Sequence, residues 1–206
     1  MSIFKRIKSF VSRSLDEQIV GYSLSELKSV FTQPLPPPAR PLPDFSQVVS
    51  LANLDIPAYY CVVLITDADV AGLEALVESD FSFVAEKPFN GLPVKRYSNT
   101  RNNEHLIYFK SNSEFNATTI RMVTNSIDFL NSLQGMRLAV PPPWIAFEGY
   151  DPAWWGGAMQ GAQGYYNDSY FLPFFTRLSR SERQHYYAKF NASDAWIESL
   201  EPMYAE

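Results

Sequence analysis

The spacing of apolar residues in the central part of the chain predicts alternating strands and helices. Residues 58–65 form an apolar run rich in β-branched and aromatic side chains, which is typical of a buried strand. After a helix start signal at residues 66–69, residues 68–79 place their apolar side chains on one helical face. Shorter β-rich patterns predict further strands at 81–86, 92–97 and 105–110.

Two more helices are expected on either side of these elements. Residues 45–53 fit a short helix and residues 117–134 fit a long one that ends at Gly135. The apolar stripe of the long helix consists of Ile120, Val123, Ile127, Leu130 and Leu133. The order of strand, helix, strands and helix predicts an α+β fold, with helices packed on one face of a mostly antiparallel sheet.

The first 43 residues have a different pattern and mark a boundary. Residues 2–15 carry apolar side chains on one helical face and basic ones on the other. A second helix is expected after Ser23, because Ser23 and Glu26 have the spacing of a capping box. Residues 34–43 contain six prolines, which indicates an extended spacer. We therefore expect a helical N-terminal extension at 1–33, a proline-rich linker at 34–43 and one α+β domain at 44–206.

The last part of this domain, residues 139–206, is expected to be a helical subregion rich in aromatic residues. An irregular segment begins at Pro141 and is followed by a helical pattern at 163–178 that is interrupted near Pro173. Ser179 and Glu182 repeat the capping-box spacing and predict a helix at 179–190. A last short helix is expected at 193–200.

The charge and composition exclude some classes of function. The chain has a net charge of −5, and residues 34–206 carry −7 of it, which argues against binding to nucleic acid. The single cysteine, Cys61, lies within an apolar strand pattern and cannot form an intramolecular disulfide. No secretory signal and no apolar stretch of about 18 residues is found. The sequence therefore predicts a soluble, cytoplasmic protein.

The residues that usually carry catalysis are few. His105 and His185 are the two histidines, too few with Cys61 to predict a metal site. Asp67 and Asp69 follow a strand, where a D-x-D pair can bind a metal, but aspartates at a helix start also cap the helix. The glycine-rich residues 156–164 lack the spacing of a phosphate-binding loop. No catalytic residue, metal ligand or cofactor is assigned.

The aromatic segment at 141–175 holds the candidate binding residues. They combine aromatic side chains with carboxylates: Trp144, Glu148, Asp151, Trp154, Trp155, Tyr165, Tyr166 and Asp168. Three interpretations remain open for them. The aromatic residues could fill a core, the whole set could form an acidic-rimmed interface, or the three carboxylates could line a glycosidase-like cleft.

Three features of the chain together resemble a known class of proteins. They are an acidic α+β body without a catalytic set, the aromatic block, and the segment that follows it, Leu178-Ser179-Arg180-Ser181-Glu182-Arg183-Gln184-His185-Tyr186-Tyr187. The chain resembles the immunity proteins of bacterial polymorphic and type VI secretion toxin systems. The resemblance implies a non-enzymatic protein that binds one cognate toxin and occludes the active site of that toxin.

The sequence is compatible with three functions. The first is an immunity protein whose acidic, aromatic surface contacts a basic toxin domain. The second is a hydrolase that uses the carboxylates near the tryptophans. The third is a structural or membrane-peripheral subunit that docks through the basic helix at 2–15. The first, a binding protein without enzymatic activity, is favoured, and the sequence does not indicate an oligomeric state.

Overall fold

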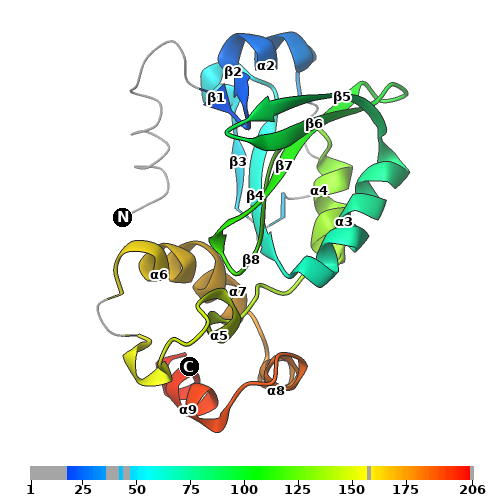
Figure 1. Cartoon of the computed structure of the whole chain (residues 1–206). Helices are drawn as coiled ribbons and strands as arrows, with labels where there is room; N and C mark the ends of the chain where they lie inside the picture. The colour runs from blue at the N-terminus through cyan, green and yellow to red at the C-terminus, as the bar shows by residue number, and fades with distance from the viewer. Residues whose placement is uncertain (1–17, 36–41, 44–46, 157–158, 205–206) are drawn as a thin grey trace.

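The chain is built around a six-stranded antiparallel sheet. The computed structural model describes residues 18–35, 42–43, 47–156 and 159–204. The strand order is β3-β4-β8-β7-β6-β5 (Figure 1). The strands are β3 (Val48–Ser50), β4 (Tyr59–Ile65), β5 (Ser82–Phe89), β6 (Leu92–Asn99), β7 (Glu104–Phe115) and β8 (Ala117–Thr124). Asn90 and Gly91 join β5 to β6 with positive φ angles, as expected for a tight hairpin turn.

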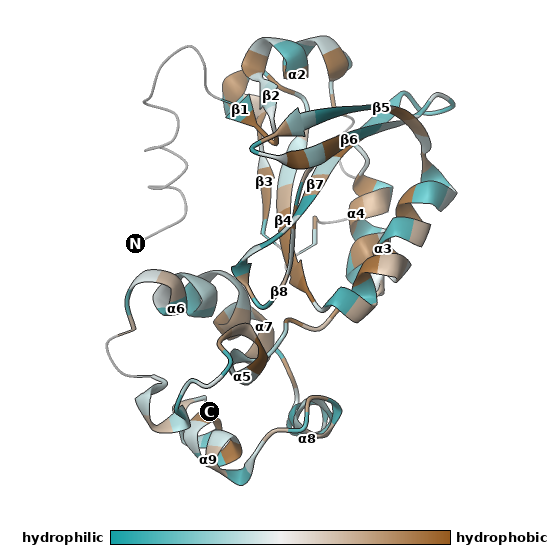
Figure 2. Ribbon diagram, viewed as in Figure 1, coloured by the Kyte–Doolittle hydropathy of each residue, from teal (hydrophilic) through white to brown (hydrophobic). Residues whose placement is uncertain are grey.

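Two helices cover one face of the sheet, as predicted for an α+β fold. They are α3 (Asp67–Asp80) and α4 (Ile127–Gly135). Leu73 and Val77 of α3 and Phe129 of α4 are buried in one core with strand residues such as Cys61 and Met122. Figure 2 shows hydrophobic residues in the strands and hydrophilic ones on the outer turns of α3.

The opposite face is covered at one end by the N-terminal elements. The hairpin of β1 (Gln18–Ile19) and β2 (Tyr22–Ser23) leads directly into α2 (Leu24–Val30). The predicted capping box is confirmed, because the Ser23 hydroxyl accepts a bond from the Glu26 N–H and the Glu26 carboxylate accepts one from the Ser23 N–H. The buried side chain of Leu27 then packs in the same core as strand residues of β6 and β7. The predicted helix at 2–15 lies outside the described residues.

The C-terminal elements form a helical lobe beyond one end of the strands (Figure 1). They are α5 (Pro143–Ala146), the 3-10 helix η2 (Pro152–Trp154), α6 (Gly161–Tyr166), the π-helix η3 (Asn167–Phe171), α7 (Leu172–Phe175), α8 (Arg180–Lys189) and α9 (Asp194–Met203). The capping box at Ser179 is confirmed. The helical pattern expected at 163–178 is interrupted by the π-helix η3, which ends two residues before Pro173. The core of the lobe reaches the sheet at Leu64, Phe115 and Ala117.

Two predicted helices were wrong in part. Residues 117–124 of the expected long helix are strand β8, which pairs with β4 on one side and β7 on the other. Residues 48–50 of the expected short helix are strand β3, and Ala52–Leu54 is a 3-10 turn. In both cases the pairing with β4 decides the structure, because hydrogen bonds to distant residues outweigh a weak local helical pattern.

Candidate interaction surface

The aromatic residues of the C-terminal lobe divide into a buried set and an exposed one. Trp155 is 3% exposed and Tyr166 is fully buried, and both belong to the core of the lobe. Trp144 packs against that core, and its indole Nε1 donates to the backbone carbonyl of Phe190 at 2.9 Å. The Tyr166 hydroxyl donates to the carbonyl of Pro141. These three candidate residues therefore stabilise the lobe and offer little surface to a partner.

Trp154 has the opposite placement. Its side chain is 70% exposed, although the next residue, Trp155, is buried. Trp154 is the last residue of η2, whose start is capped by the Asp151 carboxylate accepting from the N–H of Ala153 at 2.9 Å. The ring of Tyr150 meets the ring of Trp154 edge to face, with centroids 6.4 Å apart. The turn thus holds one large apolar side chain out into solvent.

Acidic side chains accompany the exposed tryptophan. Glu148 and Asp151 are exposed on the same short segment, and neither takes part in an ion pair with another described residue. No lysine or arginine occurs between Arg137 and Arg177 in the sequence. We call Glu148, Tyr150, Asp151 and Trp154 the Trp154 surface. It combines an apolar centre with negative charge, which is the composition of a contact surface for a basic protein.

Helix α9 packs against η2 and so holds the Trp154 surface in place. The hydroxyl of Ser199 donates to the carbonyl of Pro152 at 2.9 Å and ties η2 to α9. Met203 of α9 is 37% exposed and lies against Gly156, where a Cβ atom would fall 2.0 Å from the Met203 Cε. Gly156 has a φ of +89°, a backbone conformation that favours glycine, and the flexible end of the Met203 side chain fills the space beside it. The sequence pattern did not point to Tyr150 as part of the Trp154 surface or to Met203 as a residue that supports it.

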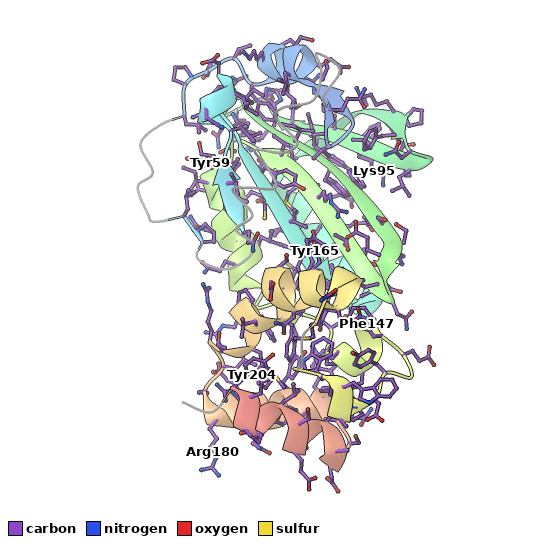
Figure 3. All side chains as sticks on the ribbon, turned by 90° about the vertical axis from the view of Figure 1, so that its left-hand side faces the viewer. Tyr59, Lys95, Phe147, Tyr165, Arg180 and Tyr204 are labelled. Atoms are coloured by element: carbon purple, nitrogen blue, oxygen red, sulfur yellow. The ribbon has the colours of Figure 1, made fainter. Side chains whose placement is uncertain are left out.

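Tyr165 and Asp168 lie on other elements of the lobe. Tyr165 is on α6 at the junction with the sheet, as Figure 3 shows, and its hydroxyl is 3.1 Å from that of Tyr170. Asp168 is exposed on η3, where its carboxylate accepts from the Asn167 amide at 3.2 Å. The eight candidate residues therefore do not form one site: three pack in or against the core of the lobe, three belong to the Trp154 surface, Tyr165 lies at the junction with the sheet and Asp168 is exposed on η3.

The residues considered for catalysis have structural surroundings. Cys61 is fully buried. The pKa of His105 is lowered by the burial of its own side chain and by the nearby positive charge of Arg96. The Asp67 carboxylate accepts the hydroxyl of Thr118 at 2.5 Å, and Asp69 accepts that of Thr66 at 2.7 Å. Both aspartates are in the first turn of α3, where their negative charge interacts favourably with the helix dipole.

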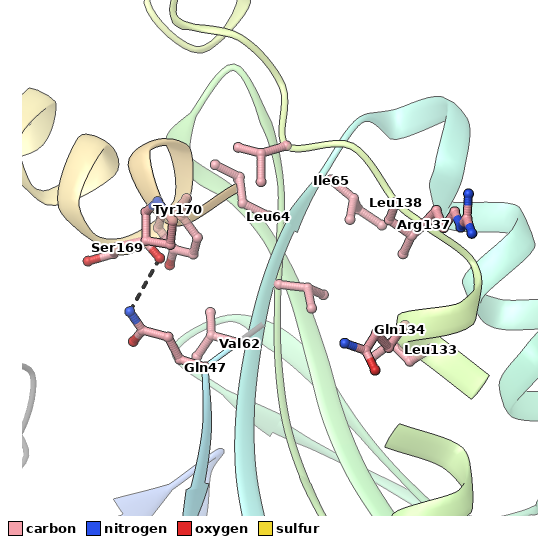
Figure 4. A pocket seen from close by; sticks show the side chains of 13 residues that line it. Gln47, Val62, Leu64, Ile65, Leu133, Gln134, Arg137, Leu138, Ser169 and Tyr170 are labelled. Atoms are coloured by element: carbon pink, nitrogen blue, oxygen red, sulfur yellow. Dashed lines mark hydrogen bonds between the residues drawn. The ribbon is translucent and has the colours of Figure 1, made fainter. Parts of the chain in front are cut away.

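A pocket of about 70 Å³ lies between the sheet and the C-terminal lobe, and the candidate carboxylates do not line it. It is lined by Gln47, by the end of β4, by the end of α4 and the segment that follows it, and by residues of η3 and α7 (Figure 4). Glu148, Asp151 and Asp168 are absent from its lining. The sequence did not predict this pocket, because it forms between segments that are far apart along the chain.

No family model, curated protein or solved structure matches the chain. None of the helices in the described part of the chain has the length and apolar character needed to cross a membrane.

Proposed function

We propose that this chain is a protein-binding module that contacts a basic partner through the Trp154 surface. The observation that carries the proposal is the exposure of Trp154. Of the four tryptophans, Trp155 and Trp196 are buried, Trp144 is half-buried, and Trp154 alone is 70% exposed. Exposing a tryptophan to water is unfavourable unless a partner covers it, and tryptophan is among the residues that dominate binding energy at interfaces.

The chemistry of the surface sets the kind of partner. An indole at the centre of an interface gains affinity when a pocket on the partner removes it from water. Glu148 and Asp151 would attract lysine or arginine side chains around that pocket and exclude acidic surfaces. A folded protein domain with a basic rim around an apolar recess satisfies both requirements.

The finer proposal follows the sequence resemblance to immunity proteins. In this proposal the partner is a cognate toxin domain, and the Trp154 surface covers the opening of the toxin's active site. Many toxins act on anionic substrates such as nucleic acids, which require basic active sites. An acidic surface with an aromatic anchor could occupy such a site in place of the substrate.

Co-expression with the product of the adjacent gene tests this proposal. The full chain should form a complex that survives affinity purification, and it should relieve any growth inhibition caused by that product. Trp154→Ala should weaken the complex by at least about tenfold, which corresponds to the loss of an interface hot spot. The double variant Glu148→Lys with Asp151→Lys should weaken it further and reduce its dependence on salt.

The matched control is Phe83→Ala. Phe83 is 58% exposed on β5, so its replacement removes a comparable exposed ring outside the Trp154 surface. It should leave both binding and growth protection unchanged. Absence of a complex, or equal weakening by Trp154→Ala and Phe83→Ala, would count against the proposal.

A further inference from the structure

Arg96 and His105 lie on the face of the sheet that α2 covers, and neither belongs to the Trp154 surface. The pairing of β6 with β7 places Arg96 opposite Ile107 and Ser98 opposite His105. Ile107 is buried in the core that α2 shares with the sheet, so the side chains of both pairs face the α2 side. Ser98 is therefore a direct neighbour of His105, and Arg96 is a diagonal one.

Among the described residues, nothing on the edge strand β5 covers these side chains. The pairing of β5 with β6 places Ala85 beside Arg96 and Ser82 beside Ser98. Ala85 and Ser82 are exposed, and both are too short to cover a guanidinium. Arg96, Ser98 and His105 are themselves partly exposed. The two rows of side chains that these pairs form contain no acidic residue.

Two nitrogen atoms of this group are left without a hydrogen bond. The Nε atom of Arg96 and the Nδ1 atom of His105 are buried, and neither has a partner among the described residues. Arg96 also forms no ion pair with any described residue. A guanidinium carries five N–H donors and no acceptor, so the terminal nitrogens of Arg96 remain available to a ligand that accepts hydrogen bonds. In neutral His105 we place the proton on Nε2, because a buried N–H at Nδ1 without an acceptor would be costly.

The positive charge of Arg96 is not compensated by a carboxylate of the described residues. The carboxylate of Glu26 on α2 binds Lys87 of β5 at 2.8 Å instead. Burial raises the pKa of Tyr22 on β2, and the charge of Arg96 opposes that rise. Burial and the charge of Arg96 both lower the pKa of His105, so His105 is neutral at pH 7. Arg96 and the side chains beside it on β6 and β7 therefore carry a single positive charge.

This arrangement fits a carboxylate better than a phosphate. A guanidinium and a carboxylate are both planar, form two parallel hydrogen bonds and carry single charges that cancel. A phosphate monoester carries a charge of about −2 and would need a second cation. Neutral His105 does not supply that cation.

We propose that Arg96, Ser98 and His105 form a binding site for a carboxylate group. The guanidinium of Arg96 binds both carboxylate oxygens, and the hydroxyl of Ser98 and the Nε2 atom of His105 are additional donors. The carboxylate belongs either to a small organic acid or to an acidic side chain of another protein. Figure 3 shows Lys95, the sequence neighbour of Arg96, on the sheet and away from the C-terminal lobe. The site is thus separate from the Trp154 surface, and the failure of one proposal leaves the other in place.

The chain contains two histidines, so nuclear magnetic resonance can follow both rings in one spectrum. His185 is exposed on α8 and serves as the internal reference. The pH of the full chain is varied in sodium acetate and in sodium chloride of the same ionic strength. Acetate should raise the pKa of His105 by about 0.5–1, because the bound negative charge offsets that of Arg96. It should leave the titration curve of His185 unchanged.

A capped tripeptide distinguishes the two sources of the carboxylate. Its only acidic group is a glutamate side chain, and the version with glutamine is the control, which should have no effect. If the glutamate peptide raises the pKa of His105 more than acetate does at the same concentration, the ligand is an acidic side chain of a protein. If acetate is at least as effective, the ligand is a small organic acid.

Substitutions on β6 test the role of each side chain. Arg96→Gln should abolish the effect of acetate, and without acetate it should raise the pKa of His105, because no neighbouring cation then disfavours the imidazolium. The matched control is Lys95→Gln, which removes a charge from the same strand. Lys95 pairs with Tyr108 and so lies on the opposite face of the sheet, and its replacement should change neither result. Ser98→Ala should weaken acetate binding by about threefold.

The proposal is wrong if neither acetate nor the glutamate peptide raises the pKa of His105 more than sodium chloride does. It is also wrong if Arg96→Gln and Lys95→Gln alter acetate binding equally while far-UV circular dichroism shows both variants to be folded. A third result against it is a His105 pKa at or above the ordinary value of about 6.5 in the free protein at low salt. An acidic group of the chain itself would then face Arg96 and occupy the site.

Discussion

Buried tyrosine hydroxyls fasten the C-terminal lobe to the chain segment that leaves the sheet. The hydroxyl of Tyr186 donates to the carbonyl of Val140 at 2.7 Å, and that of Tyr166 donates to the carbonyl of the next residue, Pro141. Burial raises the pKa of both phenols well above the usual value, so both remain donors at neutral pH. Two adjacent backbone acceptors that water cannot reach are satisfied in this way.

Replacing Tyr186 by Phe tests the contribution of one of these bonds. The substitution keeps the ring packing but leaves the buried carbonyl of Val140 without its donor, which should lower the free energy of unfolding by about 1–2 kcal/mol. Tyr150→Phe is the matched control, because its hydroxyl makes only a 3.5 Å contact at the surface. Denaturant unfolding of the two variants should separate them, and equal stability would contradict the assigned role.

The glycines of two turns make a second pair for comparison. Gly21 and Gly91 have φ angles of +72° and +78°, so any other residue is strained at both positions. A Cβ at Gly21 would also lie 2.8 Å from the Cβ of Phe89, whereas the space around Gly91 is open. Gly91→Ala should cost about 1 kcal/mol, and Gly21→Ala about 2–4 kcal/mol. Thermal unfolding of both variants measures the difference, and a smaller effect at Gly21 would show that the hairpin does not need this close contact.

Strand β8 shows what a local pattern can and cannot predict. Ile120, Val123 and Ile127 follow helical spacing, yet β8 ends at Thr124 and α4 begins at Ile127. The apolar residues of β8 face both sides of a central strand, so their spacing carries no clear period of two. Local signals succeeded where the side chain itself forms the boundary, as at the capping boxes of Ser23 and Ser179.

Two buried threonines of β8 differ in whether their hydroxyl groups have hydrogen-bond partners. The buried hydroxyl of Thr124 donates to the carbonyl of His105 at 2.8 Å and accepts from the N–H of Ser126 at 3.1 Å. The equally buried hydroxyl of Thr119 has no partner among the described residues. Thr124→Val should therefore lower the free energy of unfolding by about 1–3 kcal/mol, and Thr119→Val should leave it unchanged or raise it.

Chemical denaturation of the two valine variants checks this expectation. Both variants keep the shape and β propensity of the side chain, so a difference between them reports on the hydrogen bonds alone. A loss of stability in Thr119→Val as large as in Thr124→Val would contradict the assignment.

At the scale of the whole molecule, the fold class could be predicted, but which aromatic side chains of the lobe reach the surface could not. The sequence identified the aromatic segment, yet it did not distinguish Trp154 from Trp155, which are 70% and 3% exposed. Their difference depends on how η2 packs against α9, a contact between segments more than 40 residues apart.

The many buried tyrosines make the whole molecule sensitive to high pH. Burial raises the pKa of Tyr60 to about 12, and it also raises the pKa of Tyr166 and that of Tyr186 well above the ordinary value. Above pH 10, the ordinary tyrosine pKa, the unfolded chain releases phenolic protons that the folded chain retains. Stability is therefore unaffected by these groups below pH 10 and falls as the pH rises from 10 toward and beyond 12.

Absorbance at 295 nm and far-UV circular dichroism, followed together from pH 9 upward, should show this coupling. Exposed tyrosines should ionise first with unchanged dichroism, and the buried ones should then ionise together with the loss of secondary structure. In denaturant all twelve tyrosines should titrate near their ordinary pKa. If the folded protein titrates all of its tyrosines near pH 10 with its dichroism intact, the hydroxyls of Tyr166 and Tyr186 are accessible to solvent, and the lobe is held to the sheet by packing without them.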